Sequence, residues 1–192
     1  MDNTALTQGG AIWNSGYMNF TDEALFEGNE VESENSEVRG GGIYNDGIIT
    51  FGRFATFDGN IALSLGNKNS YGGAIYNSGG SVVFEDTDSN EETPAVPNIT
   101  YGMTFKGDTL FTGNKAESET WNTQGGAVYN SVYMLLPGEN TFGGYQTDEN
   151  GEYVLDSEGN KISLGNEAKL GGAIYNGGGK KEGDVIGQQV RL

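Results

Sequence analysis

The sequence of 192 residues contains no cysteine and no histidine, and it has only three prolines and ten basic residues. The missing cysteine and histidine exclude disulfides, thiol and imidazole nucleophiles, and zinc sites of the usual kind. The low proline content excludes collagen-like and proline-rich linker sequences. Against the ten basic residues stand 27 acidic ones, and the net charge of −17 repels nucleic acid. We therefore expect no nucleic-acid partner and no cofactor.

Long apolar runs are also missing. No window approaches 18 apolar residues, and residues 1–4 are neither basic nor apolar, so we expect no membrane span and no targeting signal in this sequence. Glycine, in contrast, is abundant, with 33 residues. Hydrophobic residues make up 35% and aromatic residues 11%, which is too much for a disordered acidic tail. We expect residues 1–192 to form a single folded domain.

The glycines belong to an internal repeat. The hexapeptide Gly-Gly-(Ala/Gly)-(Ile/Val)-(Trp/Tyr)-Asn starts at residues 9, 40, 72, 125 and 171. A second element, Phe-x-Gly-Asn, occupies residues 26–29, 57–60 and 111–114, with a degraded copy at 142–145. It follows the first glycine by 17 residues in three units and by 39 in the third, so about 22 residues are inserted there.

Between the two elements lies a stretch with the period of a half-buried strand. In residues 17–20, 48–51, 81–84 and 133–136 the second and fourth positions are apolar, so these side chains are predicted to point inward. Each unit then offers three short strands, with glycine or asparagine at the bends. Such strands bury a core only when equivalent strands stack. The sequence therefore predicts an all-β, right-handed parallel β-helix of about five coils, with the hand taken from the general rule for parallel crossovers.

Two columns of like residues follow from this stacking. The hexapeptide ends in an asparagine that we expect to form an internal hydrogen-bonded ladder. The alternative is that these asparagines merely tolerate left-handed turns. The ladder residues are Asn14, Asn45, Asn77, Asn130 and Asn176.

The residue before each asparagine is aromatic and should point outward. We favour a structural role, in which these rings stack on one another or are covered by the 11- to 12-residue loops after the second element. The alternative is a flat platform that binds sugar rings or a partner protein. The column consists of Trp13, Tyr44, Tyr76, Tyr129 and Tyr175.

Two insertions should project from the rod, at residues 85–101 and 146–161. The first begins like a calcium loop, and Asp86, Asp88 and Asn90 are a weak calcium candidate beside the interpretation as a solvated acidic loop. The second is predicted to be a hairpin arm, with strands at 152–155 and 161–164 around a turn at 156–160. Binding specificity usually lies on such projections.

The paired motifs Gly-Gly-Ala-Ile and Phe-x-x-Asn resemble the repeat of the polymorphic membrane proteins, autotransporter adhesins first described in chlamydiae. The resemblance extends from residue 9 to residue 176. It implies a right-handed parallel β-helix used for adhesion or surface display, at an extracellular or cell-surface location. Neither end of the repeat has an obvious polar cap. We therefore expect a flanking solenoid or neighbouring subunits at the rod ends.

Three functions remain open. The first is a non-enzymatic surface or secreted module that binds a protein or glycan surface. The second is a structural subunit of a larger assembly, in a non-cytosolic lumen, with its rod ends covered by neighbours. The third and least favoured is a polysaccharide-active enzyme, for which Glu27 and Asp58 occupy equivalent positions in successive coils. We assign no catalytic residue.

Overall fold

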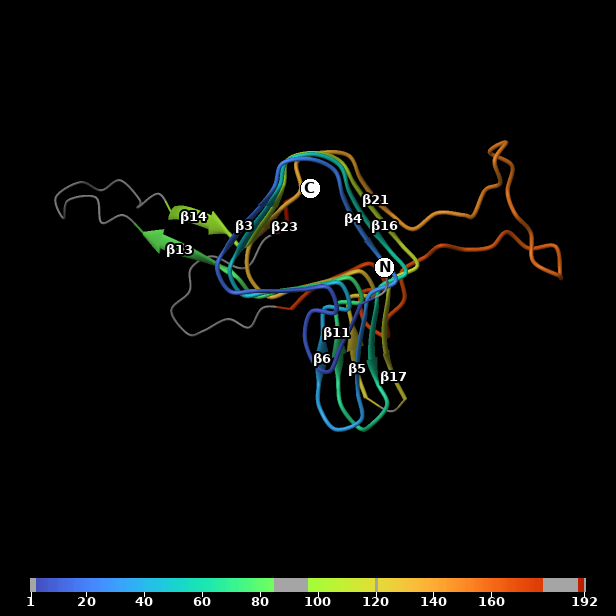
Figure 1. Ribbon diagram of the computed structural model, residues 1–192, viewed down its shortest axis with the longest axis horizontal. Coiled ribbons are helices and arrows are strands. Elements are labelled where there is room, and N and C mark those ends of the chain that lie inside the picture. Colours follow the sequence, from blue (N-terminus) through green and yellow to red (C-terminus); the bar gives the residue numbers. More distant parts are fainter. Residues whose placement is uncertain (1–2, 85–96, 120, 178–189, 192) are drawn as a thin grey trace.

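The computed structural model describes residues 3–84, 97–119, 121–177 and 190–191. These residues form short strands and no helix, and the repeat units lie on one another as parallel coils (Figure 1). Viewed along the stack, three faces give a triangular outline, from which a side lobe and two longer projections extend. The predicted all-β parallel β-helix is confirmed.

The hexapeptides form the first face, a five-stranded parallel sheet. Each strand pairs with its equivalent in the next coil in perfect register, so that Ile43 lies between Ile12 and Ile75. We number the coils 1 to 5 by these strands, which are β2 (Ile12–Asn14), β7 (Ile43–Asn45), β12 (Ile75–Asn77), β19 (Val128–Asn130) and β22 (Ile174–Asn176).

The other two faces are also parallel sheets with like residues in register. The second face contains β3 (Tyr17–Phe20), β8 (Ile48–Phe51), β15 (Met103–Phe105), β20 (Met134–Leu135) and β23 (Val190–Arg191). The third face contains β4 (Ala24–Glu27), β9 (Ala55–Asp58), β16 (Thr109–Thr112) and β21 (Asn140–Phe142).

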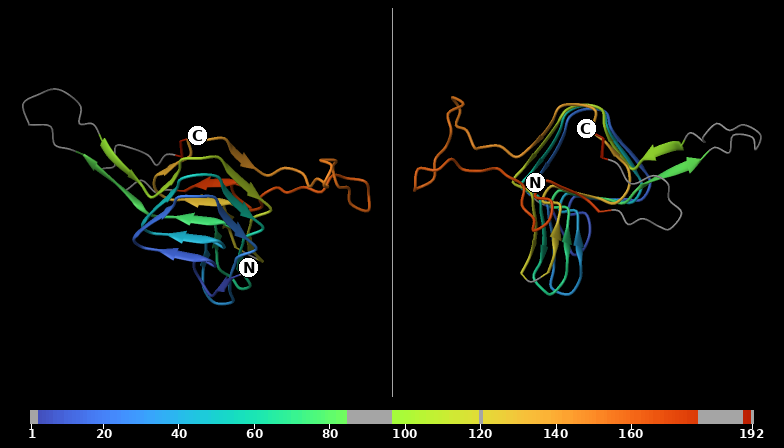
Figure 2. Two further views of the ribbon diagram at one scale, coloured as in Figure 1. Left: turned by 45° about the horizontal axis from the view of Figure 1, so that its top comes forward. Right: turned by 180° about the vertical axis from the view of Figure 1, so that it is seen from behind.

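One predicted strand is wrongly placed. The stretch 81–84 does not enter the second face; Met103 occupies that position instead and pairs with Ile49. Residues 81–84 belong to β13 (Gly80–Phe84), which pairs antiparallel with β14 (Pro97–Tyr101) in a hairpin that leaves the stack (Figure 2). The insertion therefore precedes the middle strand of coil 3. The calcium candidates Asp86, Asp88 and Asn90 lie outside the described residues.

Stacked phenylalanines fill the core of the triangle. On the second face Phe51 lies between Phe20 and Phe105, with ring centroids 4.9 and 4.6 Å away. A second column on the third face contains Phe26, Phe57, Phe111 and Phe142, with neighbouring centroids 4.8 to 4.9 Å apart. The two columns meet edge to face, an arrangement that aromatic pairs favour. Burial of these rings provides the main hydrophobic stabilisation of the stack.

The two glycines of the hexapeptide have different functions. The first adopts a positive φ in every coil, as in Gly40 with a φ of 65°. The second allows the backbones to approach closely, because a Cβ on Gly41 would lie 2.2 Å from the carbonyl oxygen of Gly73. Among the described residues, every positive φ belongs to a glycine. The asparagines of the repeat therefore do not occupy left-handed turns, and that alternative is wrong.

The segments that follow Phe-x-Gly-Asn are strands rather than loops. They leave the triangle, form two further parallel sheets and return, which creates the side lobe (Figures 1 and 2). Val31, Val38 and Ala62 form a small buried core between these sheets. The sheets consist of β1 (Thr4–Ala5), β5 (Glu30–Ser33), β10 (Ile61–Ser64) and β17 (Lys115–Ser118), and of β6 (Val38–Arg39), β11 (Ser70–Tyr71) and β18 (Thr123–Gln124).

Candidate functional site

The aromatic column lies on the outer side of the first face. Its rings stack nearly parallel, with centroids 5.2 Å apart between Tyr44 and Tyr76 and 4.8 Å apart between Tyr76 and Tyr129. At the ends, Trp13 lies 6.4 Å from Tyr44, and Tyr175 lies 5.5 Å from Tyr129. Because each middle ring is sandwiched by its neighbours, only ring edges are presented to solvent. A flat sugar-binding surface is therefore limited to the end rings.

The side lobe packs against the middle of this column. Tyr71 meets Tyr76 and Tyr129 edge to face, and the guanidinium of Arg39 lies 5.7 Å from the ring centroids of Tyr71 and Tyr76. Burial raises the pKa of all three tyrosines, and that of Tyr129 rises to about 12, with a smaller contribution from neighbouring Tyr76. The phenols remain neutral at physiological pH. These contacts join the lobe to the stack, which gives the middle of the column a structural role.

The hexapeptide asparagines lie in a single hydrogen-bonded chain inside the stack. Asn14 donates from Nδ2 to Oδ1 of Asn45 at 2.8 Å, and Asn45 donates in the same way to Asn77. The chain continues through Asn130 to Asn176. Asn45 also donates to the carbonyl oxygen of Gly102 at the bend. The amides therefore satisfy backbone groups that the bend leaves without a strand partner.

The stack contains a second asparagine chain, which was not predicted from the sequence. The asparagines of Phe-x-Gly-Asn form it, from Asn29 through Asn60 to Asn114, and it extends to Asn3 at one end and Asn166 at the other. Asn166 belongs to the degraded fourth copy of the motif. There the chain leaves the stack after Phe142 and returns at Gly165, so the motif is divided by an insertion. The Gly-Asn pair at residues 165–166 was the available signal.

This insertion, residues 143–165, forms the arm that extends to the right in Figure 1. It is not a simple hairpin, because three short segments (145–147, 153–155 and 161–163) pair around a triangle. The Gln146 N–H donates to the Ile162 carbonyl, the Val154 N–H to the Gln146 carbonyl, and the Ile162 N–H to the Val154 carbonyl, at 2.9 to 3.1 Å. The predicted pairing of the second and third segments is present, and the first segment was not expected.

We call residues 145–163 the knob. Its sequence signal is an eight-residue repeat, Tyr-x-x-Asp-x-x-Gly, at residues 145–151 and 153–159. Each aspartate organises a turn: Asp148 Oδ1 accepts hydrogen bonds from the N–H groups of Asn150 and Glu152, both at 2.9 Å. These backbone donors lower the pKa of Asp148. The pKa of Asp156 is lowered in the same way, mainly by the hydrogen bond from the Asn160 N–H.

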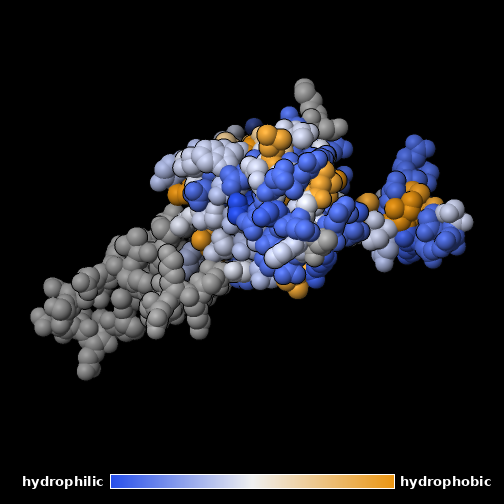
Figure 3. Space-filling view, turned by 90° about the horizontal axis from the view of Figure 1, so that it is seen from below, coloured by the Kyte–Doolittle hydropathy of each residue, from blue (hydrophilic) through white to orange (hydrophobic). Residues whose placement is uncertain are grey.

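One side of the knob exposes aromatic rings. Tyr145 and Tyr153 are 52% and 51% exposed and meet edge to face. The ammonium of Lys161 lies 3.5 Å from the Tyr153 ring centroid, a cation–π contact that restrains both side chains. Leu155 is 55% exposed on the same projection, and Figure 3 shows an apolar patch on the arm within a hydrophilic surface. Exposed, restrained aromatic side chains of this kind are typical of binding interfaces.

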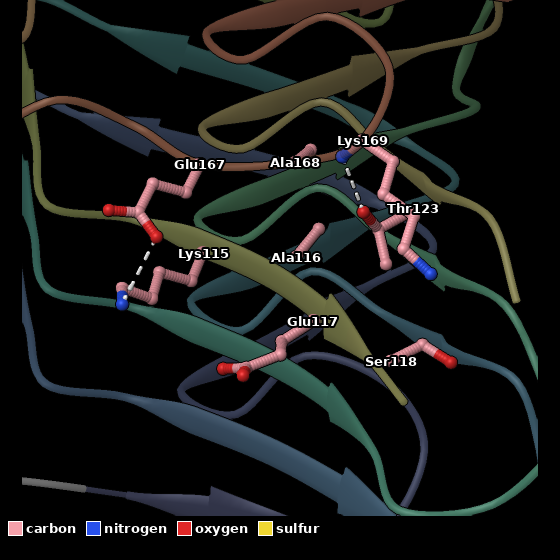
Figure 4. A pocket seen from close by; sticks show the side chains of 8 residues that line it. All are labelled: Lys115, Ala116, Glu117, Ser118, Thr123, Glu167, Ala168 and Lys169. Atoms are coloured by element: carbon pink, nitrogen blue, oxygen red, sulfur yellow. Dashed lines mark hydrogen bonds and ion pairs between the residues drawn. The ribbon is translucent and has the colours of Figure 1, made fainter. Parts of the chain in front are cut away.

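A hollow of about 340 Å³ opens at one end of the side lobe (Figure 4). The segment from Asn166 to the hexapeptide of coil 5 is too short to follow β17 and β18 to the tip of the lobe. It crosses only the base, where Lys115 forms an ion pair with Glu167 at 3.2 Å. The hollow is lined by Lys115, Ala116, Glu117, Ser118, Thr123, Glu167, Ala168 and Lys169.

The carboxylates considered for an enzyme are stacked on the outer side of the third face. Glu27 pairs in register with Asp58, and Asp58 accepts a 2.7 Å hydrogen bond from the hydroxyl of Thr112 in the next coil. Within the described ranges, no group of three or more acidic residues is arranged to hold a metal ion. In the same ranges, none of the chain forms a helix that could span a membrane.

Among known proteins, the chain matches one family model. No curated protein and no solved structure matches the chain. A family model, that of the Chlamydia polymorphic membrane protein repeat, matches residues 55–78 and 108–131. Each match runs from the third face through the side lobe to the hexapeptide strand, so the lobe segments lie within the matched repeat. The chain carries the Chlamydia polymorphic membrane protein repeat in at least these two copies, as its motifs predict.

Proposed function

We propose that this chain is a non-enzymatic surface or secreted β-helix module that binds a partner protein through the knob. The observation that carries the proposal is the pair Tyr145 and Tyr153, half exposed and held by Lys161 at the end of a projecting arm. Tyrosine supplies a large contact area at a low entropic cost, and the closed triangle of backbone hydrogen bonds presents it in a fixed arrangement.

The resemblance to the polymorphic membrane proteins supports a surface-associated, adhesin-like role and an extracellular or cell-surface location. The stack supports the same role physically. Its hydrogen-bonded coils form a rigid base, and binding residues are commonly placed on loops that such a base positions. Two projections, the arm and the β13–β14 hairpin, leave different corners of the triangle (Figure 1).

The test compares the whole protein with a variant that lacks the arm. Removing residues 143–164 and inserting one threonine restores the sequence Phe-Thr-Gly-Asn in coil 4, as in coil 3. Beads coated with each protein are applied to cultured epithelial cells and to surfaces coated with extracellular-matrix proteins. We expect retention of the parent beads and loss of retention without the arm. The same loss is expected for the double variant Tyr145→Ala/Tyr153→Ala.

Tyr17→Ala is the matched control, because Tyr17 is 88% exposed but lies on the second face, away from the arm. Equal retention of parent and armless beads would contradict the proposed role of the knob. Absence of retention on every surface would contradict binding as the function.

A second candidate, a structural subunit of a larger assembly, is favoured by a different observation. Ile12, Met18 and Phe20 are only partly buried in coil 1, whereas Ile43 and Phe51, which follow in coil 2, are fully buried. A further coil placed on coil 1 would cover these side chains. In that case, a flanking solenoid segment or a neighbouring subunit provides the coil, and the purified chain is expected to self-associate. No comparable observation favours a polysaccharide-active enzyme.

A further inference from the structure

An aromatic residue adjoins the residues that line the hollow at the end of the side lobe. Trp121 lies on the segment between β17 and β18 and is 53% exposed. Its backbone is held by two residues that line the hollow: its N–H donates to Ser118 Oγ at 3.3 Å, and its carbonyl accepts from Lys169 Nζ at 2.8 Å. Among the residues that the structure describes, no other ring stacks on the indole. The indole is therefore half exposed and takes no part in ring stacking, unlike the middle rings of the aromatic column.

The side chains around the hollow are suited to a ligand rich in hydroxyl groups. The carboxylates of Glu117 and Glu167 accept hydrogen bonds, and the ammonium groups of Lys115 and Lys169 donate them. The buried hydroxyls of Ser118 and Thr123 already bond within the lobe, Ser118 to the Lys68 carbonyl and Thr123 to the N–H of Lys169. Lys115 and Lys169 balance Glu117 and Glu167, so the lining is neutral in a chain of net charge −17. The floor contains the small side chain of Ala116, which leaves space beside the backbone. The hollow also lies within the size range of small-ligand sites.

We propose that this hollow, together with Trp121, binds a neutral sugar residue of a glycan. The apolar C–H face of a pyranose ring packs on the half-exposed indole, and its hydroxyl groups bond to the charged side chains of the lining. The balanced charge of the lining favours a neutral sugar over an anionic one, which the acidic chain repels. Trp121 is the only tryptophan in the three long lobe segments, and it lies on the segment beside the open end.

The inference rests on the proposed role in surface binding, but the hollow and the knob lie on different projections and can fail separately. The probes are the methyl glycosides of glucose, galactose, mannose and N-acetylglucosamine, together with lactose and cellobiose. Saturation-transfer NMR detects contact with each sugar, and indole fluorescence of Trp13→Phe follows binding, because this variant keeps Trp121 as its only tryptophan.

We expect saturation transfer to the ring protons of at least one of these sugars and a fluorescence change that saturates with its concentration. Trp121→Ala should weaken binding by at least about tenfold. Lys169→Met, which keeps the side-chain stem, should weaken it less, because one donor is lost and the ring remains. Trp13→Phe and Tyr145→Ala/Tyr153→Ala should bind the sugar as the parent does. Circular dichroism checks that each variant is folded, and Trp121→Phe serves as the conservative replacement if Trp121→Ala does not fold.

Absence of saturation transfer with every sugar would overturn the inference, even if the knob mediates binding to cells. Transfer that is unchanged in folded Trp121→Ala would also overturn it. That result would place the sugar contact elsewhere on the chain. Loss of the transfer in the knob variant would assign the sugar to the arm instead.

Discussion

Asn60 donates from Nδ2 to Oδ1 of Asn114 at 2.9 Å, although 54 residues separate them in the chain. Both side chains are completely buried. The same Nδ2 donates to the carbonyl of Phe26, and the Oδ1 of Asn60 accepts from Asn29. One amide thus connects three successive coils. This makes the asparagine chain a connection along the stack, comparable in continuity to the phenylalanine columns beside it.

Replacement of Asn60 by alanine should therefore be costly. The change removes one buried hydrogen bond each from the Phe26 carbonyl, the Nδ2 of Asn29 and the Oδ1 of Asn114, and a buried group that loses its partner costs about 1 to 3 kcal/mol. We expect the free energy of unfolding in urea to fall by about 3 kcal/mol or more. Asn176→Ala, at the exposed end of the other chain, should cost less than about 1 kcal/mol. Similar losses for both variants would contradict a role for buried amides.

The two classes of repeat glycine should respond differently to alanine. A Cβ on Gly41 would lie 2.2 Å from the Gly73 carbonyl oxygen and 2.4 Å from that of Ile61, so two coils must move apart. Gly59 has a φ of 60° but open space around it, and only backbone strain of about 1 to 2 kcal/mol is expected there. Gly41→Ala should lose at least twice as much stability in urea as Gly59→Ala. The reverse order would show that the coils are not closely packed at Gly41.

The repeated motifs made the triangle predictable. Stacked asparagines, inward Ile43 and Ile75, and outward Tyr44 and Tyr76 all follow from identical residues at equivalent positions, because parallel coils bring like residues together. The side lobe offered no such signal. Its core depends on Val31, Val38 and Ala62, which are small and belong to no repeated motif, so the segments around them resembled loops.

Two insertions obscured the rest of the pattern. Both 81–84 and 102–105 have apolar residues at the second and fourth positions, and alternation alone cannot show which stretch lies in the stack. The pairing of Met103 with Ile49 decides it. Asn166 was separated from Phe142 by the arm, so its position in the second asparagine chain was hidden. The open hollow beside Trp121 depended on the short segment before coil 5, whose path only the three-dimensional structure shows.

Deletion of the β13–β14 hairpin tests the placement of β15, rather than residues 81–84, in the second face. Gly79 and Gly102 lie in contact at its base, since a Cβ on Gly102 would lie 1.7 Å from the Gly79 carbonyl oxygen. Removing residues 80–101 joins them and makes coil 3 equal in length to coil 1. We expect a single cooperative urea transition, with a free energy of unfolding within about 1 kcal/mol of the parent. Removal of residues 100–121 is the size-matched control and should abolish folding, because it takes away β15 and β16.

The aromatic column should make the protein sensitive to alkali. Burial raises the pKa of Tyr129 to about 12 from an ordinary value of 10.0, so the folded state holds this proton more tightly than the unfolded chain. The stability that the neutral phenol provides is therefore fully present below pH 10 and is lost as the pH rises from 10 through 12. The urea midpoint should be level from pH 7 to 9 and then fall.

Tyr129→Phe removes the titrating hydroxyl and should flatten part of this fall, whereas Tyr17→Phe, on a ring that is 88% exposed, should leave it unchanged. Absorbance of phenolate near 295 nm, recorded in the same samples, should show a tyrosine that ionises only as the fold is lost. Burial also raises the pKa values of Tyr71 and Tyr76, so the fall should become shallow only when all three are replaced by phenylalanine. A midpoint equally dependent on pH in the triple variant would assign the alkaline sensitivity to groups outside the contact between lobe and stack.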